Sequence, residues 1–128
     1  MAQFGSAPVF ATKAYTQGKF STLLDAWDFA ISQYSESNSI RGKVCPKDAY
    51  LGLCECGLVK GIPAGKYGGP ARNVNGRYAV DAYRILKSNP TLAANKRALW
   101  DTIPEPRAVN ENNQIDVVVS LLRAGMLV

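Results

Sequence analysis

The sequence predicts an all-α fold, a single irregular bundle of about six short helices with a glycine-rich basic loop, forming one domain over residues 1–128. Apolar residues recur at helical spacing in most segments between the glycine, proline and serine breakers, and strand-like alternation is scarce. Hydrophobic residues make up 47% of the chain and charged residues 20%, which are globular values. A chain of 128 residues is also long enough to bury a real core.

Capping residues delimit the first two helices. Ser6 is the expected N-cap of the first helix, Pro8 suits its first turn, and Gly18 ends it. Ser21 or Thr22 caps the second helix. The inward faces of these helices are apolar and comprise Ala7, Phe10, Ala11, Ala14, Leu24, Trp27, Ile31 and Tyr34.

A loop and a third helix follow. The serine-rich run Ser35–Ser39 predicts the loop, and Pro46 suits the first turn of a helix that runs to about Cys56. Gly57 then occupies the position of a helix-terminating glycine, and the apolar Leu58 beyond it is typical of a Schellman ending.

Three further helices are expected after the glycine-rich stretch. The fourth covers roughly residues 75–87 and ends at Asn89, before a proline. Asn95 caps a short fifth helix, and Asn113 opens the last, where Asp116 complements the helix dipole. The inward residues of the last helix are Ile115, Val118, Val119 and Leu122.

Residues 51–59 and 119–127 have similar patterns. In each, an expected apolar helix ends at a glycine, and further apolar residues follow the glycine. We interpret them as two similar helix C-caps; an internal repeat is the alternative. The core is expected to contain Trp27, Phe29 or Ile31, Leu53, Tyr78, Leu86, Trp100 and Leu122.

Composition excludes several classes of function. The chain contains no histidine, so Ser-His-Asp and Cys-His mechanisms cannot be built within it, and the commonest metal ligand is missing. The chain has three cysteines, an odd number and too few for a disulfide scaffold. Free thiols indicate a reducing compartment. The first residues lack the pattern of a signal peptide, and no apolar stretch is long enough to cross a membrane. We therefore expect a soluble, cytoplasmic protein.

Positive charge is concentrated between residues 41 and 77. This segment holds seven Lys or Arg residues against two acids, an excess that equals the net charge of +5 for the whole chain. Within it, the loop from Lys60 to Arg77 has more glycines than a simple connection needs, and ordering them costs backbone entropy. We therefore predict a functional surface there, whose binding residues are Lys60, Lys66, Tyr67, Arg72 and Arg77.

The cysteines offer one candidate for chemistry. Cys45 is expected at a helix N-terminus beside Lys43 and Lys47, a setting that favours thiolate, although a structural thiol is the competing interpretation. Cys54 and Cys56 point in different directions from one helix, so we expect two buried small side chains and no metal site.

The block CPKDAYLGLCECGLVKGI, residues Cys45–Ile62, resembles the signature of a small, uncharacterised bacterial family. That signature reads Cys-Pro-Lys-x-Ala-x-Leu-Gly-Leu-Cys-Glu-x-Gly-Leu-x-Lys-Gly-Ile, and the family is also similar to this chain in its last helix, Asn113–Leu127. The resemblance implies a domain of unknown function and brings no activity, cofactor or site residue with it.

The favoured function is a non-enzymatic protein-interaction module that docks a protein partner and needs no cofactor, metal or membrane. The alternative is a nucleic-acid-binding protein that uses the basic loop Lys60–Arg77, because cations and an aromatic side chain serve phosphate contacts and base stacking. A small enzyme with a reactive Cys45 is the third hypothesis. No other catalytic residue is predicted.

Overall fold

The computed structural model describes residues 2–34, 42–104 and 110–128, and it confirms the all-α prediction. In these residues β pairing is limited to one isolated β-bridge. The helices, in order, are α1 (Ala2–Thr16), α2 (Leu23–Tyr34), α4 (Val44–Glu55), α5 (Val74–Ser88), the 3-10 helix η1 (Pro90–Ala94), α6 (Lys96–Thr102) and α7 (Gln114–Arg123). The predicted loop Ser35–Ser39 lies outside the described residues.

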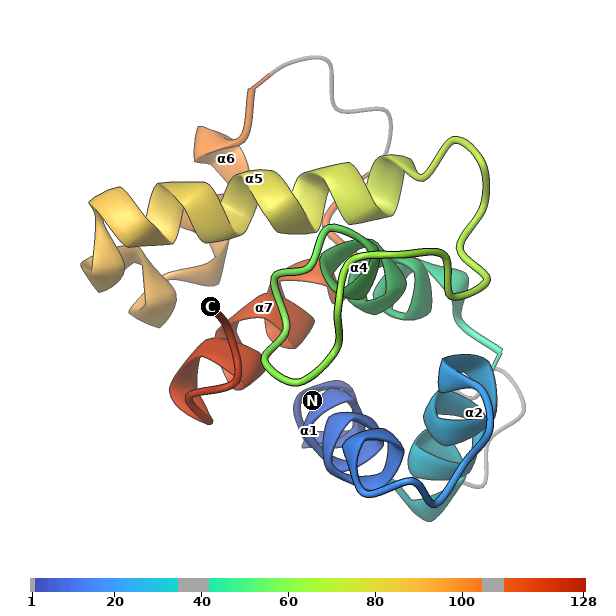
Figure 1. Cartoon of the computed structure of the whole chain (residues 1–128). Coiled ribbons are helices and arrows are strands. Elements are labelled where there is room, and N and C mark those ends of the chain that lie inside the picture. Colours follow the sequence, from blue (N-terminus) through green and yellow to red (C-terminus); the bar gives the residue numbers. More distant parts are fainter. Residues whose placement is uncertain (1, 35–41, 105–109) are drawn as a thin grey trace.

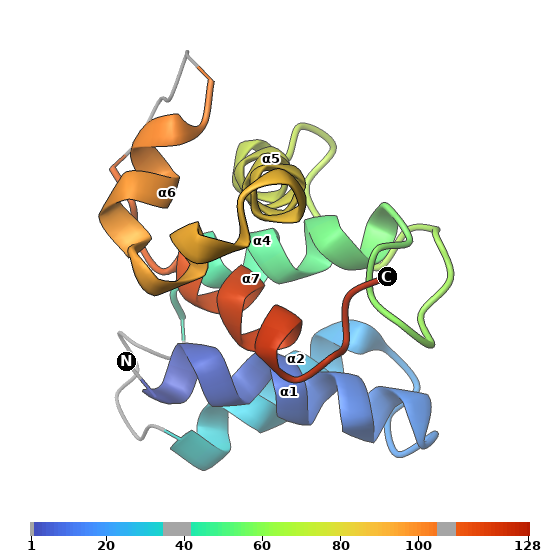
Figure 2. The same cartoon turned by 90° about the vertical axis from the view of Figure 1, so that its left-hand side faces the viewer.

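Helix α7 lies at the centre of the bundle (Figures 1 and 2). It contacts α1, α4, α5 and α6, while α1 pairs with α2 and α4 pairs with α5. The α1–α2 pair therefore covers one side of α7 and the α4–α5 pair covers the other (Figure 2). None of the described helices combines the length and the apolar character that a bilayer crossing requires.

Two aromatic pairs organise the core. Trp27 of α2 stacks on Tyr50 of α4 with ring centroids 5.3 Å apart, and Tyr78 of α5 meets Trp100 of α6 edge to face at 5.2 Å. These aromatic side chains are all buried. The core prediction is confirmed for Trp27, Ile31, Leu53, Tyr78, Leu86 and Trp100.

The predicted inward faces of α2 and α7 are partly wrong. Phe29 and Tyr34 are 44% and 42% exposed, and Leu122 is half-buried whereas its neighbour Leu121 is buried. Helix α7 contains the run VVVSLL and is apolar around most of its circumference, so spacing alone does not identify the side that faces the core. Packing in the bundle selects the face that holds Ile115, Val117, Val118 and Leu121.

Helix α1 starts earlier than predicted, so Ser6 is not its N-cap and Pro8 lies inside the helix. The reason is Phe4, which is 1% exposed, since the additional helical turn buries its ring and this burial offsets the cost of an interior proline. The Thr12 hydroxyl donates to the Pro8 carbonyl at 2.8 Å and lies 2.7 Å from the Tyr50 hydroxyl. Because Thr12 has one hydroxyl proton, Tyr50 donates to Thr12, and this buried chain joins α4 to α1.

Helices α4 and α5 cross at two glycines. A Cβ atom on Gly52 would lie 2.4 Å from the Cα of Gly76, so the two helix backbones are in direct contact. Asn73 fixes the crossing, because its Oδ1 accepts from the Gly76 N–H at 2.8 Å and its Nδ2 donates to the Asp48 carbonyl at 2.9 Å. Asn73 is thus both the N-cap of α5 and a bond to α4.

Helices α4 and α7 both end in Schellman motifs, as predicted. The N–H of Leu58 donates to the Leu53 carbonyl at 3.0 Å, and the N–H of Met126 donates to the Leu121 carbonyl at 2.9 Å. Each motif contains a glycine in the left-handed region, namely Gly57 with φ 74° and Gly125 with φ 71°.

The two segments that leave these motifs pair with each other. Val59 and Leu127 form an antiparallel β-bridge. The N–H of Lys60 donates to the Met126 carbonyl at 2.8 Å, and the N–H of Val128 donates to the Leu58 carbonyl at 2.9 Å. The similar endings recognised in the sequence are therefore neighbours in space.

Candidate functional site

The segment between α4 and α5, residues 57–73, is the glycine-rich loop, and it passes in front of α4 (Figure 1). Glu55, the last residue of α4, holds the middle of this loop. Its Oε2 accepts hydrogen bonds from the N–H groups of Tyr67 at 2.8 Å and Gly69 at 3.0 Å, and its carbonyl accepts from the Gly65 N–H at 3.2 Å. A Cβ atom on Gly69 would approach Oε1 to 3.0 Å, so glycine permits this close contact.

The base of the loop is also fixed. Val59 and Ile62 are buried, and Lys60 bonds through its backbone N–H to the chain after α7. The C-terminal residues accordingly lie beside the glycine-rich loop (Figure 2). The loop is therefore held at its base by α7 and in its middle by Glu55.

Tyr67, a predicted binding residue, holds the loop in place. Its hydroxyl donates to the Pro63 carbonyl, and its ring meets the ring of Tyr15 edge to face with centroids 6.2 Å apart. The side chain is half-buried as a result. This ring is thus a less suitable platform for base stacking than the sequence alone indicates.

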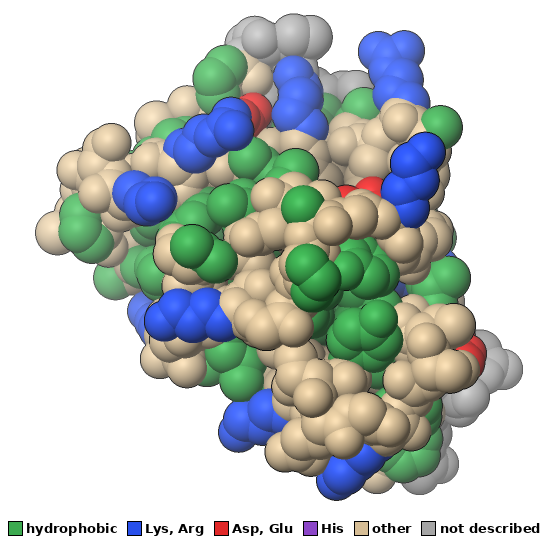
Figure 3. All heavy atoms as spheres, viewed as in Figure 1, with side chains coloured by type: hydrophobic (Ala, Val, Ile, Leu, Met, Phe, Trp, Pro, Cys, Tyr) green, Lys and Arg blue, Asp and Glu red, His purple; other side chains and the backbone are tan. Residues whose placement is uncertain are grey.

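Three of the four predicted cations lie on the loop. Lys60, Lys66 and Arg72 are exposed. Arg77 is not a loop residue: α5 begins at Val74 because Asn73 caps it, and the Arg77 guanidinium lies 4.9 Å from the centroid of the Tyr78 ring. Figure 3 shows Lys and Arg side chains spread over α5 and around the loop, with few Asp or Glu atoms visible on this face.

Two cavities adjoin these residues and divide the predicted set. A cavity of about 520 Å³ is lined by Lys66 and Tyr67 together with Tyr15 and the start of α2. A groove of about 320 Å³ between α4 and α5 is lined by Arg77, with Arg84, Glu55 and Cys56 among its other walls. Neither space is lined by Lys60 or Arg72, so the five predicted residues do not converge on one pocket.

The cysteines differ in exposure. Cys45 is half-buried at the start of α4, as expected, and Cys54 is buried, where burial raises the pKa of its thiol to about 12. The expectation of a buried Cys56 is wrong, because this residue is the C-cap of α4 and is exposed. In the described part of the chain, no three Cys, Asp or Glu residues are grouped so that they could hold a metal ion.

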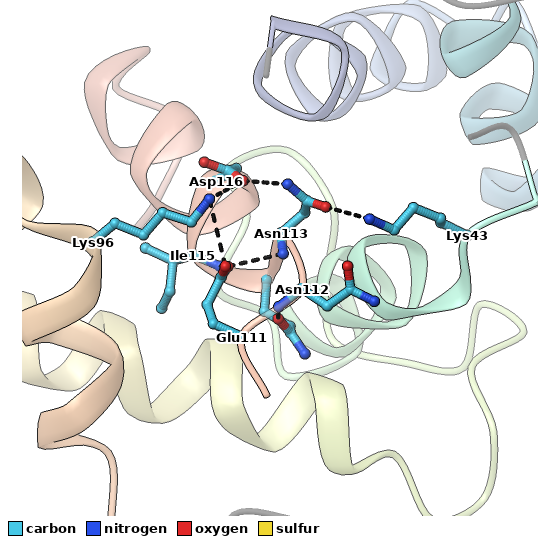
Figure 4. Close-up of polar contacts among 8 residues, drawn as sticks. Lys43, Lys96, Glu111, Asn112, Asn113, Ile115 and Asp116 are labelled. Atoms are coloured by element: carbon cyan, nitrogen blue, oxygen red, sulfur yellow. Dashed lines mark hydrogen bonds and ion pairs between the residues drawn. The ribbon is translucent and has the colours of Figure 1, made fainter. Parts of the chain in front are cut away.

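A polar cluster at the start of α7 was missed by the sequence analysis (Figure 4). Glu111 Oε2 accepts from the N–H of Asn113 at 2.8 Å and from that of Ile115 at 3.4 Å. Lys96 lies 2.8 Å from an Asp116 carboxylate oxygen and 3.4 Å from one of Glu111. The Glu111 carboxylate therefore caps α7 and is paired with a cation of α6.

Asn113 connects this cluster to α4. Its Oδ1 accepts from Lys43 Nζ at 2.6 Å, and its Nδ2 donates to Asp116 at 2.7 Å (Figure 4). Burial opposes ionisation of Asp116, but the hydrogen bonds from Lys96 and Asn113 outweigh it and lower the pKa of this carboxyl. Both carboxylates are thus engaged in joining the starts of α4, α6 and α7, which is a structural role.

A family model matches residues 1–128, and its description is a family of unknown function. No curated protein and no solved structure matches the chain. The comparisons therefore assign no activity to the chain.

Proposed function

The chain belongs to this family, DUF6979, and we propose that it is a non-enzymatic interaction module whose glycine-rich loop binds an acidic segment of a partner protein. The observation that carries this proposal is an ordered loop with exposed cations. Among the described residues, Lys60, Lys66 and Arg72 have no partner carboxylate within ion-pair distance. The Glu55 carboxylate, which contacts the loop, accepts hydrogen bonds from backbone amides instead.

The order of the loop favours binding. Glycine-rich segments lose much backbone entropy when a partner immobilises them. Here the contacts with Glu55 and with Met126 already restrict the segment in the free protein. A partner therefore meets cations on a restrained backbone, and less of the interaction energy is spent on ordering the loop.

The contacts of Tyr67 favour a protein partner over single-stranded nucleic acid. Its ring packs on Tyr15 and its hydroxyl is bonded to Pro63, whereas single-strand binders present aromatic faces on which bases stack. Carboxylates of an acidic segment need only hydrogen-bonding cations, which Lys60, Lys66 and Arg72 supply. Binding of nucleic acid through phosphates is the competing outcome of the test.

The test is affinity purification from the native host with three baits. The loop variant carries Lys60→Ser, Lys66→Ser and Arg72→Ser, and a control variant removes the same charge elsewhere through Lys19→Ser, Lys87→Ser and Arg97→Ser. We expect a protein partner that co-purifies with the parent and the control variant even after nuclease treatment. The same partner should not co-purify with the loop variant. The loop variant should keep its melting temperature, because exposed charges contribute little to stability.

Nuclease treatment separates the alternatives, because added salt weakens the contacts of these cations with carboxylates as well as with phosphates. Binding that survives only without nuclease, or a partner that the loop variant retains as fully as the control, would contradict the proposal.

A further inference from the structure

A second surface is an open groove of about 620 Å³ between α1 and α7. Small side chains line much of it, and a Cβ atom on Gly5 would lie 3.6 Å from the Cβ of Ser120. Ser6 and Ala124 extend the small-residue lining along the two helices. A floor of this kind admits the close approach of another backbone.

The lining residues follow helical spacing on both sides. From α1 the groove receives Val9 and Phe10, and from α7 it receives Val119. Val119 was expected in the core, but the bundle buries Val117 and Val118 and leaves Val119 half-buried at the groove. Val119 is therefore an apolar side chain of α7 that the bundle leaves partly accessible, beside the polar Asp116, Ser120 and Arg123 on the same wall of the groove.

Aromatic side chains continue this surface beyond the groove. The Phe10 ring lies 5.9 Å from the ring of Phe29 and 6.4 Å from that of Tyr34, measured between centroids. Phe29 and Tyr34 are each more than two-fifths exposed, and Tyr34 itself lines the groove. Contiguous exposed apolar surface of this kind is a feature of binding sites.

The charges at the groove are unequal. Lys13 and Arg123 both line it and are exposed, and the Arg123 guanidinium makes one hydrogen bond, 3.3 Å long, to the Ala93 carbonyl. The single acidic wall residue, Asp116, is paired with Lys96 at 2.8 Å. The groove therefore presents net positive charge beside the apolar Val9, Phe10 and Val119, and a complementary ligand carries acidic residues beside apolar ones.

We infer that this groove binds an amphipathic α-helix of a partner protein, with apolar residues at i, i+3 or i+4, and i+7 against Val9, Phe10 and Val119, and with acidic residues beside Lys13 and Arg123. The floor of small residues between the two helices and the cationic wall both suit this occupant. The site is separate from the glycine-rich loop, so it gives the protein a second attachment point.

The probe is a displayed library of randomised helical peptides about four turns long, selected on the parent protein and counter-selected on Val119→Glu. We expect enriched peptides to carry the stated apolar spacing together with Asp or Glu. Their dissociation constants, measured by fluorescence anisotropy, should rise at least tenfold for Val119→Glu. Val44→Glu is the matched control, because Val44 is 52% exposed and does not line the groove.

A second variant, at an exposed position, tests the groove even if Val119→Glu misfolds. Lys13→Glu changes an exposed side chain, so it should fold normally and weaken binding of the same acidic peptides several-fold, more at low salt than at high salt. The loop variant proposed above should bind these peptides as the parent does. Absence of enrichment or equal binding to Val119→Glu would overturn the inference. So would a dimer in light scattering that Val119→Glu converts to a monomer, since a second copy of the chain would then occupy the groove.

Discussion

Replacing Gly52 by alanine tests the crossing of α4 and α5. The new methyl carbon would lie 2.4 Å from the Cα of Gly76, whereas non-bonded carbons settle at about 3.5–4.0 Å, so the helices must separate by about 1 Å. The atom it meets belongs to the backbone and cannot rotate away. Overpacking of this kind costs about 1–3 kcal/mol, and alanine recovers about 0.5–1 kcal/mol through its helix propensity. Taking the upper end of the cost, we expect a loss of about 2 kcal/mol.

Urea denaturation followed by far-ultraviolet circular dichroism measures this loss, and a thermal scan should show a melting temperature about 8 °C lower. Gly5→Ala is the matched control. It also lies within a helix, but its new Cβ would be 3.6 Å from Ser120, an ordinary contact, so the propensity gain should leave stability equal or higher. If Gly52→Ala were as stable as Gly5→Ala, the two backbones would not be in contact and the reasoning would be refuted.

Three further predictions concern polar contacts. Thr12→Val removes the acceptor of the buried Tyr50 hydroxyl and should cost about 1–3 kcal/mol in urea denaturation; a neutral result would show that this hydroxyl has another partner. Glu55→Ala should accelerate hydrogen exchange at the two loop amides that its carboxylate binds, with little change elsewhere, and unchanged protection would mean that the loop is ordered by other contacts. The lowered pKa of Asp116 stabilises the folded state fully above the ordinary carboxyl pKa of 3.8, and this stabilisation is lost as pH falls through the lower folded-state pKa. Asp116→Asn should therefore make the free energy of unfolding decline less steeply below about pH 4. An acid-unfolding profile equal to that of the parent would contradict this.

Much of the fold follows from local signals in the sequence. Asn95 caps α6 and Gly57 ends α4 at the predicted positions, because both signals depend on the backbone geometry of a few neighbouring residues. The side of α7 that faces the core could not be predicted in the same way. Val119 and Leu121 are equally apolar, and contacts with other helices decide between them.

The candidate site was predictable only in outline. Exposed cations on a glycine-rich loop could be read from composition, but the anchoring of Tyr67 and Gly69 by Glu55 joins residues that no short motif relates. The same holds for Lys43 and Lys96, which are far apart in the sequence and meet at the start of α7. Side-chain contacts between distant segments decide which predicted residues lie together, and spacing along one element does not encode them.

The β-bridge between Val59 and Leu127 bears on the order of folding. Its two residues are separated by α5, α6 and α7, so it is a non-local contact, and such contacts form slowly. During synthesis α4 emerges well before α7, so the N–H of Lys60 cannot form its hydrogen bond until the carbonyl of Met126 has been synthesised. The base of the basic loop thus acquires these hydrogen bonds only when α7 and the residues after it are in place, whereas Glu55 of α4 can hold the middle of the loop earlier, so a nascent chain presents the loop with its base still open.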